Sequence, residues 1–335
     1  MSPAPPTTIV VPAYNASATI QKCLEALRGA AAPGSEIVVV DDGSSDDTAA
    51  LAAAAGARVL RLDGNHGPGA ARNRGTREAR GDVLVFVDSD VVVAPDAIDR
   101  ARRALAESQV AAVFGSYDDH PAAPGLVSQF RNLLHHWVHQ TSSPDAFTFW
   151  AGLGAIRRSV FDAVGGFDER GPDAVLEDVE LGQRIRAAGH RILLDPAMQG
   201  THLKRWTLAS MARTDLFHRA IPWGRSLLAG GAIPRDLNLG NGQRWSVALT
   251  GVIGVAVAGA VWRPRLIAVA VGALGVIILL NRHFYDFLAR ARGLLFALAS
   301  IPVHLVHFAC GGLGFGYAWL ETRLGGPRRR SHARS

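Results

Sequence analysis

The fold class of this 335-residue chain is decided by one stretch, Asp82-Val83-Leu84-Val85-Phe86-Val87-Asp88-Ser89-Asp90. The five apolar residues 83–87 are typical of a strand that is buried on both faces of a parallel sheet. Ligands of open α/β sheets bind just beyond the carboxyl ends of the strands. Asp88 and Asp90 are therefore expected at a ligand site, with oxygen atoms suited to Mg²⁺ or Mn²⁺. An isolated Asp-Ser-Asp is more often a simple turn, so the rest of the chain has to decide between the two interpretations.

Strands and helices alternate through the first 90 residues at a spacing that predicts a parallel, doubly wound α/β sheet. The first helix is expected to be capped by Ser17 or Thr19, to run to about Leu27 and to be stopped by Gly29. A glycine-rich turn then starts the helix that carries Arg72. The strands before the stretch 83–87 are expected at 8–12, 36–40 and 58–62.

A second acidic cluster, Asp41-Asp42, follows the expected strand 36–40, so both clusters should lie at one edge of the sheet. Helix capping needs only one carboxylate, whereas a carboxylate directly after a strand can accept hydrogen bonds from a base or a ribose hydroxyl. The turn Gly67-Pro68-Gly69, followed by Arg72, suits a diphosphate. A phosphate loop of the G-x-x-x-x-G-K-[S/T] kind is absent from the sequence, which argues against a nucleotide triphosphatase.

The net charge of +6 and the apolar content of 48% are unevenly distributed. Acidic residues lie mostly before Asp195, and basic residues dominate from Lys204 onward, which indicates a polar head joined to a membrane part. We expect no nucleic-acid partner, because the head lacks a basic stripe with interleaved aromatic residues. Cys23 and Cys310 indicate neither a disulfide framework nor a metal cluster. The N-terminus does not resemble a signal peptide, so the head is expected in the cytoplasm.

The last third of the chain is expected to attach to a membrane. Residues 208–228 mix Trp, Arg and apolar residues, which predicts an interfacial amphipathic helix or an ordinary surface helix. The apolar runs 246–262 and 266–280 are each short for a span and together fit a helical hairpin better than one helix. With the third apolar run, 294–320, they predict three spans of the inner (plasma) membrane. Three spans would place the basic tail, 321–335, outside, against the positive-inside preference, so one run could instead re-enter or lie in the interface. The stretch 129–139 could line an acceptor entrance, with its histidines as solvated helix positions.

Seven short motifs follow one another along the chain. They are Val11-Pro12-Ala13-Tyr14-Asn15, residues 41–48 (DDGSSDDT), residues 69–75 (GAARNRG), Asp88-Ser89-Asp90, residues 152–158 (GLGAIRR), residues 165–169 (GGFDE) and residues 177–184 (EDVELGQR). In this order and spacing they resemble the family 2 glycosyltransferases, which have the GT-A fold. The resemblance covers roughly residues 7–206. It implies a glycosyltransferase domain at 1–206, an interfacial helix and linker at 207–245, a membrane segment at 246–320 and the basic tail.

The resemblance also implies roles for single residues. The nucleotide-sugar donor, with a UDP-sugar favoured, would be bound by Pro12, Tyr14, Asn15, Asp41, Asp42, Arg72 and Asp88. A Mn²⁺ or Mg²⁺ ion bridging the diphosphate would be held by Asp90, with Asp88 and His202 as further candidates. The acceptor or diphosphate region would include Gly152, Arg205 and Trp206. A histidine that serves only a structural purpose remains an alternative for His202.

The pair Glu177-Asp178 opens an expected helix, where acidic residues also favour the helix dipole. In the family, the Asp of this pair is the general base that deprotonates the acceptor hydroxyl and gives inversion. Asp178 is thus the expected base, supported by Glu177. For a lipid phosphate acceptor, which is already an anion, Asp178 would only position the acceptor.

The predicted function is an inverting transfer of a hexosyl-type sugar from a nucleotide-sugar to a lipid or membrane-proximal acceptor. Arg205-Trp206 resembles the end of the Q-x-x-R-W motif of processive membrane synthases, but His202 stands where that motif has Gln. A processive polysaccharide synthase therefore stays an alternative. A second alternative is a non-catalytic membrane scaffold that keeps a nucleotide-sugar fold.

Overall fold

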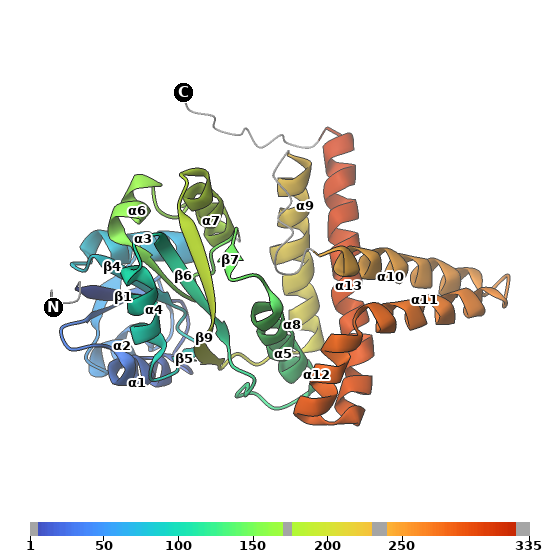
Figure 1. The fold of residues 1–335 in the computed structure, drawn as a ribbon, viewed down its shortest axis with the longest axis horizontal. Helices are drawn as coiled ribbons and strands as arrows, with labels where there is room; N and C mark the ends of the chain where they lie inside the picture. Colours follow the sequence, from blue (N-terminus) through green and yellow to red (C-terminus); the bar gives the residue numbers. More distant parts are fainter. Residues whose placement is uncertain (1–5, 170–175, 230–239, 326–335) are drawn as a thin grey trace. The chain divides into compact units, whose positions relative to one another are not determined.

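A computed structural model describes residues 6–169, 176–229 and 240–325 of the chain. The chain divides into two compact units, Met1–Arg205 and Trp206–Ser335. Unit 1 carries all the strands of the described residues, and the described part of unit 2 is helical (Figure 1). The predicted linker at 230–239 and the last ten residues of the basic tail lie outside the described residues.

Unit 1 is built around a nine-stranded sheet with the order β3-β2-β1-β4-β8-β6-β9-β5, and β7 pairs with β9. β1 to β4, β6 and β9 run in one direction, while β5, β7 and β8 run against them. The strands are β1 (Thr7–Ala13), β2 (Glu36–Asp41), β3 (Arg58–Arg61), β4 (Val83–Val87), β5 (Val91–Val93), β6 (Val110–Tyr117), β7 (Asp145–Ala146), β8 (Leu153–Arg157) and β9 (Arg191–His202).

The predicted α/β fold with a mostly parallel sheet is confirmed, and the stretch 83–87 forms its central strand, β4. All five residues of β4 are buried, as expected for a strand that is covered on both faces. The order of the later strands could not be predicted from spacing. β8 enters between β4 and β6 and is antiparallel to both, so it joins two groups of parallel strands into one sheet.

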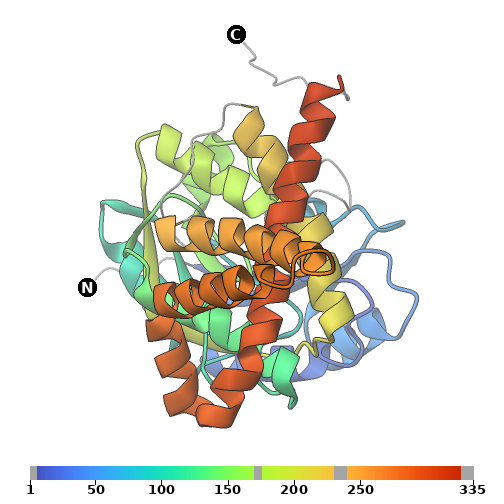
Figure 2. The same ribbon diagram turned by 90° about the vertical axis from the view of Figure 1, so that its right-hand side faces the viewer.

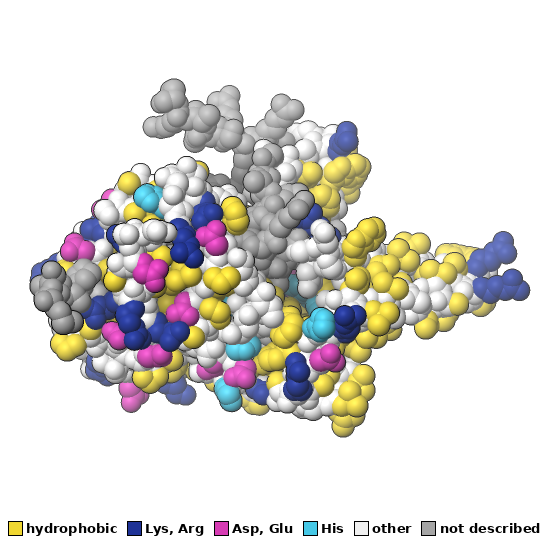
Figure 3. Space-filling model, viewed as in Figure 1, with side chains coloured by type: hydrophobic (Ala, Val, Ile, Leu, Met, Phe, Trp, Pro, Cys, Tyr) yellow, Lys and Arg dark blue, Asp and Glu magenta, His cyan; other side chains and the backbone are white. Residues whose placement is uncertain are grey.

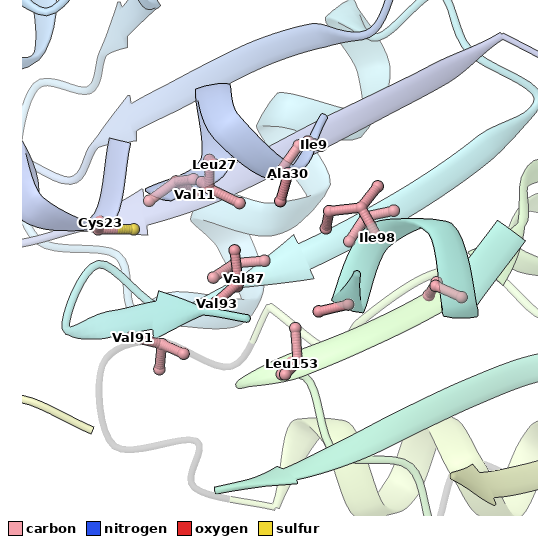
Figure 4. Packing of buried hydrophobic residues seen from close by; sticks show 14 of the residues in the cluster. Ile9, Val11, Cys23, Leu27, Ala30, Val87, Val91, Val93, Ile98 and Leu153 are labelled. Carbon is pink, nitrogen blue, oxygen red and sulfur yellow. The ribbon is translucent and has the colours of Figure 1, made fainter. Parts of the chain in front are cut away.

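Alternate residues of the central strands pack into two separate cores. Val85 and Val87 face one core, while Leu84 and Phe86 face the other. The first core, part of which Figure 4 shows, is covered by α1 (Ile20–Ala30), α2 (Thr48–Ala54) and α4 (Ala97–Ala106). The second core includes side chains of α3 (Pro68–Glu78), α6 (Arg158–Ala163) and α7 (Glu177–Ala187). A further helix, α5 (Leu126–Thr141), contacts β6 and β9.

Two sequence expectations about helices in unit 1 are wrong. Gly29 does not stop α1, which continues to Ala30. The helix ends three residues before Pro33, in accord with the restriction that a proline places on the residue before it. The prediction that the histidines of 129–139 are solvated is wrong, since His136 and His139 are buried on α5. Hydrogen bonds compensate for the lost water: the Nδ1 atoms of these two histidines bond the carbonyls of Tyr117 and Gly115 at 2.8 and 2.9 Å.

Residues 208–228 of unit 2 form one helical run. It consists of α8 (Leu208–Arg213), a π-helical stretch, η1 (Thr214–Ala220), and α9 (Ile221–Leu228). This run packs along α13 (Leu294–Arg323), where Asp215 bonds His307 at 2.7 Å and Arg225 forms a two-pronged ion pair with Glu321. One side of the predicted amphipathic helix is therefore occupied by protein.

The remaining helices of unit 2 are α10 (Asn241–Gly259), α11 (Leu266–Leu280) and α12 (Arg282–Arg292). α10 and α11 lie side by side as a hairpin, as both ribbon views show (Figure 2). The prediction of a hairpin from 246–262 and 266–280 agrees with this arrangement. Residues 282–292, within a stretch that is polar and basic in sequence, form helix α12, whose Phe284, Tyr285 and Leu288 are buried.

Among the described residues, α13 is the helix that is long and apolar enough to cross a membrane. α11 and α12 reach the same standard only if they count together as one span, and they are bent by 72° at their junction. The 15 residues of α11 measure about 22 Å, less than the roughly 30 Å of a bilayer core. The structure thus provides one candidate span, or two with the bent pair, in place of the three that the sequence predicts.

Candidate active site

Both acidic clusters lie at the same edge of the sheet. β2 and β4 flank β1 and run parallel to it, so Asp41 at the end of β2 and Asp88 just after β4 emerge on either side of the end of β1. The predicted placement of the two clusters at one edge is therefore observed. The central position of β1 between them also places Asn15, two residues after that strand, beside the turn after β2.

The carboxylates of the first cluster are engaged within the protein. Asp41 is fully buried; its Oδ1 accepts a hydrogen bond from the Ser44 amide and its Oδ2 lies 3.3 Å from Arg61. Asp42 accepts hydrogen bonds from the amides of His66 and Gly67 at 2.9 and 2.8 Å. Asp42 thus ties the glycine-rich turn to β2. The amide of Gly67, which the sequence suggests for a diphosphate, is already used by this carboxylate.

The loop after β1 is shaped to meet the turn after β2. Asn15 has a positive φ of 49°, and its Oδ1 accepts hydrogen bonds from the amide and hydroxyl of Ser45. The Asn15 amide donates to Ser44 Oγ at 2.9 Å. Pro12 is buried in β1, whereas Tyr14 is half exposed. Of the predicted base and ribose contacts, Tyr14 and Asn15 are thus exposed to solvent, while Pro12 and Asp41 are buried.

A buried arginine organises the second cluster. Arg72, on α3, donates to Asp88 Oδ1 at 2.7 Å and to Glu177 Oε1 at 3.0 Å, which links the end of β4 to the start of α7. Burial lowers the pKa of Arg72, but the charges of Asp88 and Glu177 outweigh this effect and raise it. Burial raises the pKa of both carboxyl groups, and Arg72 opposes the rise. The arginine therefore fixes the positions of two carboxylates that come from distant parts of the chain.

Asp178 lies beside this cluster without bonding Arg72. Its Oδ1 accepts the Val179 amide at 2.8 Å and its Oδ2 lies 3.5 Å from the amide of Ala151. Burial, with a contribution from the charge of Glu177, raises the pKa of Asp178 to about 7, and Arg72 opposes the rise. A carboxyl group with a pKa near the working pH can take up a proton and release it again.

Asp90 and His202 form a second polar pair. The Asp90 carboxylate lies 3.3 Å from His202 Nε2, which comes from the last residue of β9. Burial acts to raise the pKa of Asp90, but the hydrogen bond and charge of His202 and the charge of Lys204 outweigh it and lower that pKa. An ionised carboxylate and an imidazole nitrogen at this separation suit a Mg²⁺ or Mn²⁺ ion.

The described residues contain no group of three or more His, Cys, Asp or Glu side chains arranged to hold a metal ion. Of the predicted set, Asp90 and His202 lie together, whereas Asp88 Oδ1 is bonded to Arg72. Mg²⁺ is commonly held by one or two protein ligands with phosphate oxygens and water completing the shell. The pair Asp90 and His202 fits a cation of that kind.

The predicted acceptor or diphosphate residues are spread more widely. Gly152 accepts the Asp88 amide at 3.0 Å, and a Cβ atom at Gly152 would come within 2.5 Å of the Trp150 ring. Gly152 thus allows the backbone to pass close to the Trp150 ring. Arg205 is exposed at the end of unit 1, and Trp206 is the first residue of unit 2.

Two features of the site were not found from the sequence. One is the bridge from Arg72 to Glu177, which joins residues 105 positions apart. The other is Asn132 on α5, whose Oδ1 lies 2.7 Å from His202 Nδ1. A helical asparagine carries no motif of its own, and only its place within the stretch 129–139 could have drawn attention to it.

The first half of the chain matches a known family. Residues 8–165 match the family model described as "Glycosyl transferase family 2". The chain is 30% identical over 214 residues to the "Probable glycosyltransferase YdaM" of Bacillus subtilis (strain 168), which is 59% of this chain and 50% of that protein. It is 43% identical over 99 residues to the "Succinoglycan biosynthesis protein ExoO" of Rhizobium meliloti (strain 1021), which is 29% of this chain and 28% of that protein. These matches span half or less of the relatives' own length.

A solved structure resembles the fold over most of the chain. The mannosyltransferase PcManGT from Pyrobaculum calidifontis, solved in complex with GDP-Man and Mn²⁺, superposes with a TM-score of 0.57 and 19% sequence identity. The superposition covers 97% of this chain and 88% of that chain. At this identity the likeness concerns the fold.

Proposed function

Because residues 8–165 make this chain a member of glycosyl transferase family 2, we propose that it transfers a sugar with inversion from a nucleotide-sugar donor to a lipid or membrane-proximal acceptor. A UDP-sugar is the favoured donor. The observation that carries the proposal is the meeting of three carboxylates and Arg72 around the end of β4, beside the pair formed by Asp90 and His202. A fold kept only as a scaffold would have no need to desolvate so many charges in one place.

The reaction needs a base for the acceptor and compensation for the charge of the leaving group. Asp178 takes the proton of the acceptor hydroxyl as its oxygen attacks the anomeric carbon, and the bond from that carbon to the diphosphate breaks. The electron pair of the broken bond leaves with the nucleoside diphosphate. Arg72 holds Asp88 and Glu177 in place, so that these carboxylates do not move as charge develops.

Asp90 Oδ2 and His202 Nε2 would hold the divalent cation of this site. A bound Mn²⁺ or Mg²⁺ supplies positive charge to the departing diphosphate. Tyr14, exposed beside the end of β1, would stack on the base, next to Asn15 and its hydrogen bonds to Ser45.

Membrane attachment through unit 2 is the second part of the proposal. α10 and α11 expose large apolar side chains along the hairpin, among them Val255, Val261 and Val271 at 76%, 80% and 63% exposure. Arg263 and Arg265 lie at the connection of the two helices, and Figure 3 shows basic side chains at that end of the apolar hairpin. Apolar surface that ends in arginines suits a bilayer with anionic headgroups. We place the catalytic domain at the cytoplasmic face of the inner membrane.

The test uses the full chain in detergent with a panel of UDP-, GDP- and dTDP-sugars, Mn²⁺ or Mg²⁺, and mixed bacterial-type lipids. We expect release of nucleoside diphosphate from one donor, its loss on addition of EDTA, and its loss in Asp90→Ala. Asp162→Asn, which changes an exposed carboxylate on α6, serves as the matched control and should keep the activity.

Three outcomes would count against the proposal. Turnover that survives both EDTA and Asp90→Ala would remove the cation from the mechanism. Tight donor binding with no turnover for any acceptor lipid would favour the non-catalytic scaffold instead. Long polymer made by the purified protein would replace single transfer by processive synthesis.

A further inference from the structure

Asn132 is fixed in one orientation by its two neighbours. Its side chain lies between the carbonyl oxygen of Ser128, 3.0 Å from Nδ2, and the His202 ring, 2.7 Å from Oδ1. A carbonyl oxygen can only accept a hydrogen bond, so the amide nitrogen must face Ser128. The amide oxygen must then face His202. Asn132 is 2% exposed, which leaves the side chain no room to turn over without losing both bonds.

The orientation of Asn132 decides which nitrogen of His202 carries a proton. The amide oxygen of Asn132 accepts a hydrogen bond, so the ring nitrogen facing it, Nδ1, must donate. In the neutral ring, Nε2 is then the nitrogen with the free electron pair. That nitrogen faces the Asp90 carboxylate at 3.3 Å. Two electron-pair donors facing one another at this distance repel unless a proton or a metal cation lies between them.

The plane of the His202 ring is fixed as well. The Tyr117 ring stacks on it with a centroid distance of 4.3 Å and an interplanar angle of 7°. The His202 side chain is 7% exposed, so packing and the bond to Asn132 together leave it a single position. The electron pair of Nε2 lies in the ring plane, so fixing the plane also fixes the direction in which that pair points.

We propose that Asn132 is the positioning residue of the cation site, because it holds His202 as the tautomer whose Nε2 electron pair points at Asp90. The inference rests on the proposed function, since it assumes that Asp90 and His202 hold a divalent cation. It adds that a residue outside every motif determines whether His202 can serve as a ligand. Partners of this kind, which bond the second nitrogen of a ligating histidine, orient the ring and strengthen its binding.

The experiment measures Mn²⁺ binding to the full chain in detergent, in the presence of UDP, from the decrease of the free Mn²⁺ signal in electron paramagnetic resonance. Asn132→Leu keeps the volume but removes the acceptor, and we expect Mn²⁺ affinity to fall about 10–100-fold. Asn132→Asp restores an acceptor for Nδ1–H, so it should bind Mn²⁺ as tightly as the wild type or more tightly. Gln140→Leu makes the same amide-to-leucine change on α5, where the amide bonds only the Pro196 carbonyl, and should leave the affinity unchanged.

The tautomer of His202 can also be measured directly, without a variant of Asn132. ¹⁵N-histidine NMR of the metal-free wild type should show the proton of His202 on Nδ1, with His202→Gln used to assign the signal. A neutral ring with its proton on Nε2 and none on Nδ1 would overturn the proposal. The proposal would also be overturned if the wild type binds Mn²⁺ and Asn132→Leu binds it with the same affinity. In that case the proposed function would stand. Absence of Mn²⁺ binding by the wild type itself would overturn both the inference and the proposed cation.

Discussion

At the scale of single residues, the carboxylates of the site differ in what their surroundings do to them. Asp88 and Glu177 bond Arg72 directly, whereas Asp178 bonds only backbone amides. Asp178 is thus left with a pKa of about 7, raised by burial and by the charge of Glu177. Of the two residues of the pair, Asp178 is the one free to exchange a proton, because Glu177 is held in an ion pair.

The pH dependence of the transfer follows from this difference. The base must be ionised, so the transfer rate of the wild type should rise as the pH increases through about 7. Asp178→Asn should lower the rate by about 10²–10⁴-fold and remove that dependence. Steady-state rates between pH 5 and 9 check both points, and Asp162→Asn should keep the wild-type profile. A wild-type rate that is flat through this range would mean that Asp178 does not act as the base.

The free energy of unfolding should also depend on the ionisation of Asp178, but it should fall with rising pH where the transfer rate rises. The pKa of Asp178 is raised above its ordinary value of 3.8, so the unfolded chain releases this proton at lower pH than the folded protein. Between these two values the folded state binds more protons, and this group's contribution to stability falls as the pH rises. The structure thus accepts a cost in stability at neutral pH in return for a base that can be protonated.

At the scale of secondary structure elements, the position of α3 determines where Arg72 lies. α3 approaches β1 and β2 closely at Gly75: a Cβ atom there would lie 2.4 Å from Cγ1 of Val10 and 3.1 Å from Cγ2 of Val40. Gly29 in α1 has open space around the corresponding position. The two helical glycines therefore serve different purposes, although the sequence suggests a special role only for Gly29, as a helix stop.

Alanine substitutions at these two glycines should have opposite effects. Gly75→Ala should destabilise the protein by about 1–3 kcal/mol, because the added methyl group overpacks the contact of α3 with the sheet. Gly29→Ala should stabilise it by up to about 1 kcal/mol, since alanine is the better helix former and meets no neighbour. Thermal unfolding of the solubilised chain measures both. Equal shifts in melting temperature for the two variants would contradict the close approach at Gly75.

At the scale of the whole molecule, the chain separates polar chemistry from apolar surface. Every residue of the proposed site except Trp206 belongs to unit 1, while the large exposed apolar side chains of the hairpin belong to unit 2. The helical run 208–228 of unit 2 is joined to α13 by the bond of Asp215 with His307 and by the ion pair of Arg225 with Glu321. Large apolar side chains are exposed on the α10–α11 hairpin and also on α13, where Leu295 is 84% and Leu313 67% exposed.

Membrane binding should accordingly depend in part on the hairpin. The double variant Val255→Lys and Val271→Lys should float less than the wild type with vesicles that contain anionic lipid, since a lysine near the bilayer centre costs about 2.5–3.5 kcal/mol, while α13 keeps its own apolar surface. Phe147→Lys, at a half-exposed apolar position of unit 1, is the matched control and should float like the wild type. Unchanged flotation of the double variant would show that α10 and α11 do not enter the lipid.

Alternating strands and helices with acidic strand ends were enough to determine the class of fold from the sequence, and the seven motifs in their order carried the resemblance to a family. These are local patterns: a buried parallel strand needs consecutive apolar residues, and a turn that carries carboxylates follows it directly. The sequence could also place Asp41 and Asp88 at one edge, because parallel strands end on the same side of a sheet. The mixed α/β sheet and the match of residues 8–165 to the glycosyl transferase family 2 model agree with this level of prediction.

Only the tertiary structure decided how the site is held. The bonds from Arg72 to Glu177 and from Asn132 to His202 join residues 105 and 70 positions apart, and no local pattern records which distant side chains a fold brings together. The same holds for the burial that raises the pKa of Asp178 and for the packing of residues 208–228 along α13. Hydrogen bonds and desolvation depend on separations of a few ångströms in space, and the sequence alone specifies order along the chain.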